Sequence, residues 1–213
     1  MRDTAEATID AFLDQVAQRS PTPGGGSVTA LAGALACALG RMVAQYSVTP
    51  RTDAATRTVL ESVLVRLRRA DQLLRALITR DAEVYAAMTD ARRREKDGSA
   101  DAREVQGAVL EAIGAPLEMA GAASAALSTM NEFKPVASRY LLSDLGVAAV
   151  LAEAAARAAE YSVRVNLPQL TDHARRAMIV EDLERTVSRC AAYRNEIETF
   201  VHRALQPEPP SAR

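Results

Sequence analysis

Residues 21–43 read PTPGGGSVTALAGALACALGRMV, a loop rich in proline and glycine that runs directly into an apolar segment of small side chains. Pro21 and Pro23 fix their own φ angles, whereas the three consecutive glycines leave the backbone free. Ser27 is a favourable N-cap for a following helix. Small residues at three- and four-residue steps in this helix form a narrow stripe that lets another helix approach closely. The stretch therefore predicts a shaped loop followed by a tightly packed helix.

Outside this stretch, apolar residues recur at helical spacing, and no segment shows the alternating pattern of a half-buried strand. The sequence predicts six amphipathic helices, over residues 4–18, 27–47, 52–96, 100–130, 139–162 and 172–205. The third helix is longer than a usual globular helix, which leaves open a break near residues 90–94. The predicted fold class is all-α, a multi-helix bundle.

Length and composition are those of an ordinary globular protein. The chain has 213 residues, 48% of them hydrophobic and 25% charged, and a formal net charge of -1. Nothing resembles a linker, so we expect a single helical domain over residues 1–205 and a disordered proline-containing tail over residues 206–213. A nearly balanced charge gives no reason to expect a nucleic-acid or membrane partner.

The N-terminus and the cysteines predict a cytoplasmic protein. No apolar leader follows Met1, and the most apolar run, residues 28–40, is interrupted by Arg41. That run is shorter than the roughly 20 residues needed to cross a bilayer. Cys37 and Cys190 are far apart in helical patterns, which favours buried free thiols over a disulfide.

The glycine-rich loop is a candidate ligand site. The first turn of a helix presents unpaired N–H groups, and missing side chains let a ligand approach the backbone. No Gly-Lys-Ser/Thr follows, so the loop is not a nucleotide triphosphate-binding loop. The alternative interpretation is a sharp turn between two helices.

Asp81 is the main candidate for acid–base chemistry. It lies on the apolar face of the third helix, three residues after Ile78 and four before Tyr85. A carboxylate in an apolar cleft has a raised pKa, which suits it to accept and return a proton near neutral pH. The alternative is a buried acid paired with an arginine. Asp71 lies on the same side, and the sequence alone does not rank the two acids.

Other polar residues leave two interpretations each. Asp144 either caps a helix or lines a site, and Asn166 either binds a ligand or satisfies loose backbone groups near a helix break. Residues 92–94, three arginines, form either a solvated helix end or a contact for an acidic ligand tail. His173 and His202 have no partner at metal-ligand spacing, so no metal site is expected.

Three stretches resemble one known family. They are residues 21–43, DAEVY at 81–85, and SDLGVAAVLAEAAARAAEYSVRVNL at 143–167. Together they are similar to the cyclodeaminase/cyclohydrolase family of folate one-carbon metabolism. This family includes the C-terminal domain of formimidoyltransferase-cyclodeaminase and free-standing methenyltetrahydrofolate cyclohydrolases. The resemblance covers nearly the whole chain.

The resemblance implies a helical homodimer that acts on a reduced folate without a metal or redox cofactor. It implies either loss of ammonia from 5-formimidoyltetrahydrofolate or hydration of 5,10-methenyltetrahydrofolate, with Asp81 as the catalytic group that moves a proton. The implied substrate-binding residues are Pro23, Gly24, Gly25, Gly26, Ser27, Asp144 and Asn166. Residues 89–92, 137–138 and 162 depart from the family pattern. A catalytically inactive helical homologue that serves in ligand binding or assembly is therefore the alternative.

Overall fold

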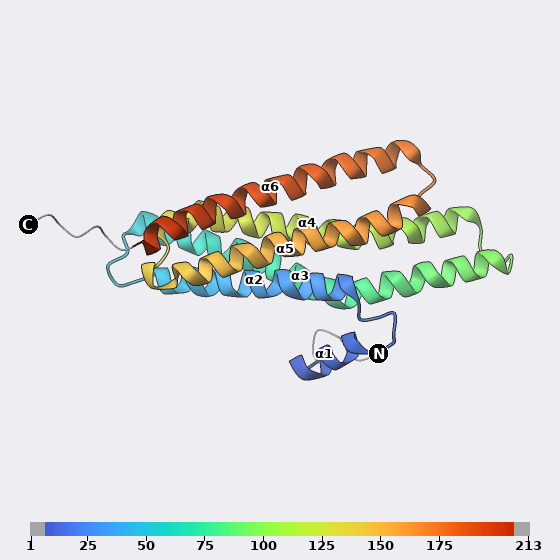
Figure 1. Cartoon of the computed structure of the whole chain (residues 1–213), viewed down its shortest axis with the longest axis horizontal. Helices are drawn as coiled ribbons and strands as arrows, with labels where there is room; N and C mark the ends of the chain where they lie inside the picture. The colour runs from blue at the N-terminus through green and yellow to red at the C-terminus, as the bar shows by residue number, and fades with distance from the viewer. Residues whose placement is uncertain (1–6, 207–213) are drawn as a thin grey trace, which may run out of the picture.

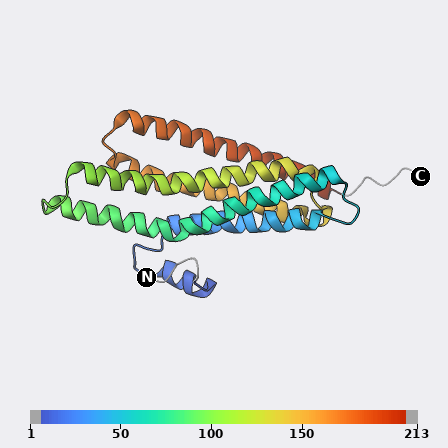
Figure 2. The same cartoon turned by 180° about the vertical axis from the view of Figure 1, so that it is seen from behind.

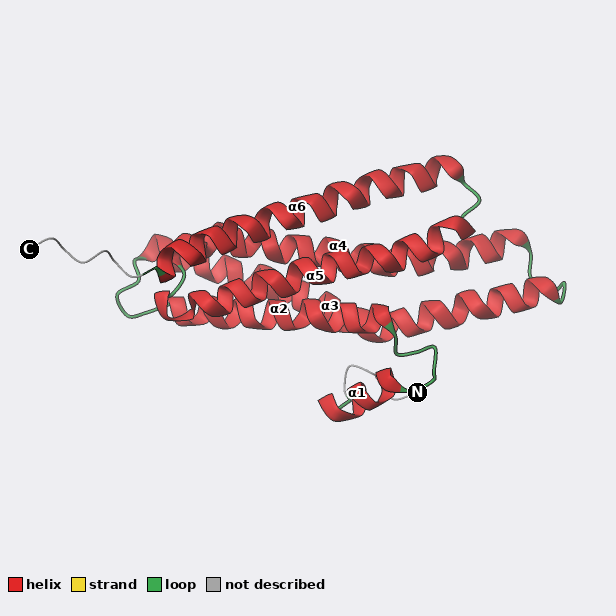
Figure 3. Ribbon diagram, in the orientation of Figure 1, coloured by secondary structure: helices red, strands yellow, loops and turns green. Residues whose placement is uncertain are grey.

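The computed structural model describes residues 7–206, in which five long helices lie side by side along one axis and a short helix lies to one side of them (Figure 1). The elements are α1 (Ile9–Ala17), α2 (Gly25–Ser47), α3 (Ala54–Lys96), α4 (Ala102–Phe133), α5 (Leu142–Asn166) and α6 (His173–Leu205). Over these residues only helices and loops are present (Figure 3), which confirms the predicted all-α class.

Aspartates set the starts of three long helices. Asp53, Asp101 and Asp172 precede α3, α4 and α6, and each side chain accepts a hydrogen bond from the backbone N–H three residues later, at 2.8–2.9 Å. Such a bond satisfies one of the free donors of the first helical turn. After α3 the chain reverses at Gly98, whose φ of 74° is in the left-handed region that favours glycine. Local sequence therefore determines where these three helices begin and where α3 ends.

The small residues of α2 allow it to pack between α3 and α5. A Cβ built on Gly33 would lie 3.0 Å from Leu74 of α3 and 3.5 Å from Ala155 of α5. Ala30, Cys37 and other small residues of α2 are fully buried, and both cysteines are free thiols, as predicted. Among the described residues, α2 is the one helix long and apolar enough to cross a membrane, but more than half of it is buried inside the bundle.

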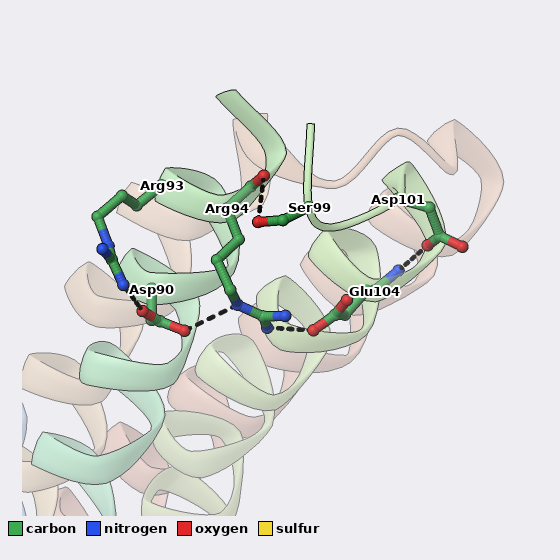
Figure 4. A network of polar contacts seen from close by, with 6 residues as sticks. All are labelled: Asp90, Arg93, Arg94, Ser99, Asp101 and Glu104. Carbon is green, nitrogen blue, oxygen red and sulfur yellow. Dashed lines mark hydrogen bonds and ion pairs between the residues drawn. The ribbon is translucent and has the colours of Figure 1, made fainter. Parts of the chain in front are cut away.

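The structure corrects two local expectations. α3 has no break near residues 90–94, where Asp90 pairs with Arg93 and Arg94 along the same helix (Figure 4). Ser27 is not the N-cap of α2, because the helix begins two residues earlier with Gly24 as its cap. Of the predicted disordered tail, only Gln206 falls within the described residues, and the prediction for residues 207–213 lies outside them.

α3 and α4 are longer than α2 and α5, so these four helices do not all end at the same level of the bundle. α3 and α4 extend beyond the start of α2, as both views show (Figures 1 and 2). The start of α2 and the end of α5 therefore lie against the middle of these longer helices. The glycine-rich loop joins α1 to α2 at the same place.

Candidate active site

A cavity of about 700 Å³ opens where the glycine-rich loop meets α3, α4 and α5. The loop side is formed by Pro21, Thr22 and residues 24–26. The other walls come from three helices: Asp81, Val84, Tyr85, Met88, Thr89, Arg92, Arg93 and Lys96 of α3, Ala112 and Pro116 of α4, and Ser162, Val165 and Asn166 of α5, with Gln169 just after it. This volume is large enough for a small-molecule ligand.

Asp81 meets the start of α2 at the wall of this cavity. Its Oδ2 accepts a hydrogen bond from the Ser27 backbone N–H at 3.1 Å. The Ser27 hydroxyl lies 3.4 Å from the same oxygen and 2.9 Å from the Ile78 carbonyl oxygen. Partial burial raises the pKa of Asp81, and the two Ser27 hydrogen bonds oppose this rise by stabilising the ionised form. No ion pair to Asp81 is found among residues 7–206, so the carboxylate is free to exchange a proton.

The close approach of loop and carboxylate depends on Gly26. A Cβ on Gly26 would lie 1.9 Å from Oδ1 and 2.3 Å from Cγ of Asp81, far inside contact distance. A Cβ on Gly25 would meet nothing within 4 Å. Gly26 is thus needed for this contact, whereas Gly25 leaves open space toward the cavity.

Asp71, the other acidic candidate, has a different environment. Its carboxylate pairs with Arg41 at 2.8 Å and with Arg75 at 2.7 Å, and its side chain is 4% exposed. It does not line the cavity. The structure therefore ranks the two acids: Asp71 is a buried acid neutralised by two guanidinium groups, and Asp81 is the unpaired acid at a cavity.

Replacing Asp71 tests its structural role. Because Asp71→Asn removes the charge that holds both arginines, we expect the free energy of unfolding to fall by about 1.5–3 kcal/mol. Urea denaturation measures this loss. A change of less than a few tenths of a kcal/mol would contradict a structural role for the ion pairs.

Asn166 lines the cavity but already uses its polar atoms. Pro116 has no N–H group, so it leaves the carbonyl of Ala112 in α4 without its usual helical partner. The Asn166 side-chain nitrogen donates to that carbonyl at 3.3 Å and to the Ser162 carbonyl at 3.2 Å. Its Oδ1 accepts from Gln169 at 3.1 Å. Asn166 therefore ties α5 to α4 and shapes the cavity wall.

Three residues expected to contact a ligand are not on the cavity wall. Ser27 is fully buried behind Asp81, and Pro23 does not line the cavity, although its loop neighbours do. Asp144 is near the start of α5, 22 residues before Asn166 and about 33 Å away along the helix. Asp144 and Asn166, both implied substrate-binding residues, therefore do not line the same cavity in the described part of the chain, because they lie at opposite ends of α5.

Sequence reasoning had named Tyr85 and Arg92 but missed other cavity residues such as Lys96 and Gln169. Tyr85, Thr89, Arg92 and Lys96 follow Asp81 on α3 at steps of three and four residues, so they share its helical face. That spacing was readable from the sequence once Asp81 was chosen. Gln169 could not be found this way, because only the fold brings it to the cavity. Its Oε1 is buried and has no hydrogen-bond partner in the described part of the chain.

The cavity holds one unpaired acid and several potential hydrogen-bond partners. Within residues 7–206, no group of three or more histidine, cysteine, aspartate or glutamate side chains is placed to hold a metal ion. The arrangement is suited to proton transfer at a bound organic molecule, with Asp81 as the group that titrates.

Comparisons with known proteins add independent information. A family model described as formiminotransferase-cyclodeaminase matches residues 8–185. A methenyltetrahydrofolate cyclohydrolase from Methylorubrum extorquens is 28% identical over 194 residues, which cover 89% of this chain and 93% of that protein. The formimidoyltransferase-cyclodeaminase of Rattus norvegicus is 31% identical over 171 residues, 78% of this chain. This match spans only 32% of the rat protein.

A solved structure shares the fold. The crystal structure of formiminotetrahydrofolate cyclodeaminase from Thermotoga maritima superposes with a TM-score of 0.85 at 24% sequence identity. The superposition covers 94% of this chain and 98% of that one. The helical arrangement described above is therefore that of a known fold.

Proposed function

Because this chain belongs to the formiminotransferase-cyclodeaminase family, we propose that it is a folate one-carbon enzyme that acts as a formimidoyltetrahydrofolate cyclodeaminase or a methenyltetrahydrofolate cyclohydrolase. Both reactions occur at the carbon that bridges N5 and N10 of tetrahydrofolate. We place the enzyme in the cytoplasm, with the reduced folate as substrate and no metal or redox cofactor.

The observation that carries this proposal is the unpaired Asp81 carboxylate at a cavity beside the glycine-rich loop. Both reactions need one group that takes a proton from one atom of the substrate or water and returns it to another. A partly buried carboxyl group with a raised pKa is suited to this exchange near neutral pH. The position of Asp81 at the cavity supports the assignment of this role to it.

In the cyclohydrolase direction, Asp81 takes a proton from the water that adds to the methenyl carbon. A tetrahedral adduct forms, and the bond from that carbon to N5 then breaks as N5 gains a proton. Asp81 can return the proton to N5, while the hydroxyl proton of the adduct is lost to water as the formyl C=O forms, so the product is 10-formyltetrahydrofolate and one proton is released overall. These transfers use the exposed side of the carboxylate, since Ser27 occupies Oδ2.

In the cyclodeaminase direction, N10 attacks the formimidoyl carbon carried by N5. The formimidoyl group reacts as its protonated amidinium, so the adduct carries an NH2 group, and Asp81 takes the proton from N10 and delivers it to this nitrogen. The bond from the carbon to that nitrogen then breaks, and ammonia leaves. The same carboxylate therefore serves either reaction. It transfers a proton from water to N5 in the first and from N10 to the leaving nitrogen in the second.

The test offers both substrates to the purified protein and follows the absorbance of the methenyl group. Loss of that absorbance faster than in buffer identifies a cyclohydrolase. Its appearance from 5-formimidoyltetrahydrofolate, with ammonia released in equal amount, identifies a cyclodeaminase. If both rates equal the uncatalysed rates, the proposed enzymatic activity is rejected. The alternative, an inactive helical homologue that serves in ligand binding or assembly, then remains.

The homodimer implied by the family resemblance also remains a proposal. Val28, Leu35 and Tyr46 of α2 lie at seven- and eleven-residue spacing and are exposed. The adjacent α5 exposes Val150 and Tyr161 at eleven-residue spacing. A second copy packed on this apolar face would cover these side chains. Light scattering after size-exclusion chromatography measures the mass in solution, and a mass of one chain would contradict the dimer.

Removing the Ser27 hydroxyl should change the pH dependence of the reaction. Its hydrogen bond lowers the pKa of Asp81, so in Ser27→Ala this pKa rises further. The low-pH limb of kcat/KM, where ionised Asp81 is lost by protonation, therefore moves to higher pH. Thr29→Val is the control, because the Thr29 hydroxyl donates to the Gly25 carbonyl at 2.7 Å and not to Asp81. A shift of the same size in both variants would contradict this role of Ser27.

A further inference from the structure

We propose that Arg92 and Lys96 form an anion subsite that holds the carboxylates at the end of the ligand opposite to Asp81. The inference rests on the proposed function, because it takes the ligand to be a reduced folate with a p-aminobenzoylglutamate arm. The sequence left the arginine cluster at residues 92–94 with two interpretations, a solvated helix end or a contact for an acidic tail. The structure separates its members.

Some of the basic side chains at the end of α3 are already neutralised by acidic partners. Arg93 pairs with Asp90 at 2.6 Å, and Arg94 pairs with Asp90 and with Glu104 of α4 (Figure 4). In the part of the chain that the structure describes, no acidic group pairs with Arg92 or Lys96. Both of these side chains line the cavity that contains Asp81. Two uncompensated positive charges therefore face the same space as the proposed catalytic acid.

Arg92 also carries a hydrogen-bond donor that no described residue satisfies. The Nε of Arg92 is buried and has no hydrogen-bond partner among residues 7–206. A buried guanidinium donor without a partner is costly, and a carboxylate is the group whose geometry matches the guanidinium fork. A carboxylate bound at the guanidinium group of Arg92 would supply the missing negative charge.

The distance from Asp81 to Arg92 along α3 fits the length of an extended folate. Arg92 follows Asp81 by eleven residues on one continuous helix, a separation of about 16 Å along the axis. Helical side chains lean toward the N-terminus, so the guanidinium lies closer to Asp81 than this value. Lys96 is one further turn away. A molecule with a pterin at Asp81 and an extended benzoylglutamate arm would thus point its carboxylates at Arg92 first and Lys96 next.

The positions of the charged side chains in the cavity determine the expected orientation of the ligand. The cavity has an unpaired acid at one end and unpaired cations at the other, and it includes apolar side chains such as Val84 and Met88 between them. A reduced folate has the same order of groups: a hydrogen-bonding pterin, an aromatic ring and a dianionic glutamate. The opposite orientation would place the carboxylates against Asp81.

Binding of two stable probes tests the subsite without turnover. One probe is 5-formyltetrahydrofolate, and the other is 5-formyl-6-methyltetrahydropterin, which has the same ring system but no arm. For Arg92→Gln we expect Kd for the first probe to rise about 10–100-fold, the loss of a charge-assisted hydrogen bond, with Kd for the second unchanged. Lys96→Gln should act in the same direction, and Arg92→Lys should recover part of the affinity.

The matched control is Arg68→Gln, which removes one positive charge from an exposed position of the same helix outside the cavity. It should leave both Kd values unchanged, and thermal melting should show that all variants are folded. Equal weakening of both probes by Arg92→Gln, no weakening of the first, or no binding of the first probe to the parent protein would each overturn the subsite.

The two proposals fail separately. A parent protein that binds 5-formyltetrahydrofolate in an Arg92-dependent way but turns over neither substrate would reject the enzyme and keep the subsite. A parent protein with turnover but without dependence on Arg92 would keep the enzyme and reject the subsite.

Discussion

Asp81→Asn is expected to lower kcat by about 10²–10⁴-fold, the usual contribution of a positioned acid–base group. The amide keeps the size of the side chain and can still accept the hydrogen bond from the Ser27 N–H, so the cavity should keep its shape. It cannot take up and return a proton. Steady-state kinetics measures the loss, with whichever of the two folate substrates the parent protein turns over.

The same variant should not be less stable than the parent protein near neutral pH. Burial raises the pKa of Asp81 in the folded state above its value in the unfolded chain. The unfolded chain then binds fewer protons than the folded one between the two pKa values, so ionisation of Asp81 lowers stability as pH rises through this window. Asn carries no such charge. Melting curves over this pH range should therefore show a weaker loss of stability with rising pH in Asp81→Asn.

Two outcomes would contradict this assignment of Asp81. Unchanged kcat in Asp81→Asn would remove it from proton transfer. A large loss of stability at neutral pH would mean that the carboxylate is mainly structural, as Asp71 is.

Gly26→Ala is expected to reduce activity as strongly as Asp81→Asn, by a different route. Its Cβ would lie 1.9 Å from Oδ1 of Asp81, so the carboxylate must leave its place against the start of α2. The displaced side chain would lose its hydrogen bonds to Ser27 and its orientation toward the cavity. We expect kcat to fall about 10²-fold or more, because misplacing a catalytic group by about 1 Å has effects of this size.

Gly25→Ala is the control for this effect, because the two glycines are neighbours in the first turn of α2. A Cβ on Gly25 meets nothing within 4 Å, and alanine reduces the freedom of the unfolded chain. Folding stability should therefore be kept or slightly increased, with activity well above that of Gly26→Ala. Equal losses of activity in both variants would contradict a specific role for the close approach of Gly26 to Asp81.

Helical periodicity was enough to predict the six helices, because each buries one stripe of apolar side chains. The starts of α3, α4 and α6 agree with the sequence to within two residues, since aspartates cap them. Ser27 was the exception. A serine before an apolar helix usually caps it, but here Gly24 does so, and the Ser27 hydroxyl reaches α3 instead. Local preference was overruled by a contact between helices.

The sequence by itself determined the helical class, the loop and the candidate acids, because these depend on spacing along the chain and on residue type. Only the tertiary structure decided between Asp71 and Asp81, because that choice depends on which arginines lie across the helix interface. It also separated Asp144 from Asn166 and gave Asn166 the carbonyl that Pro116 leaves free. A side chain's charge and hydrogen-bond partners are set by neighbours distant in sequence, and the packing of the helices brings those neighbours together.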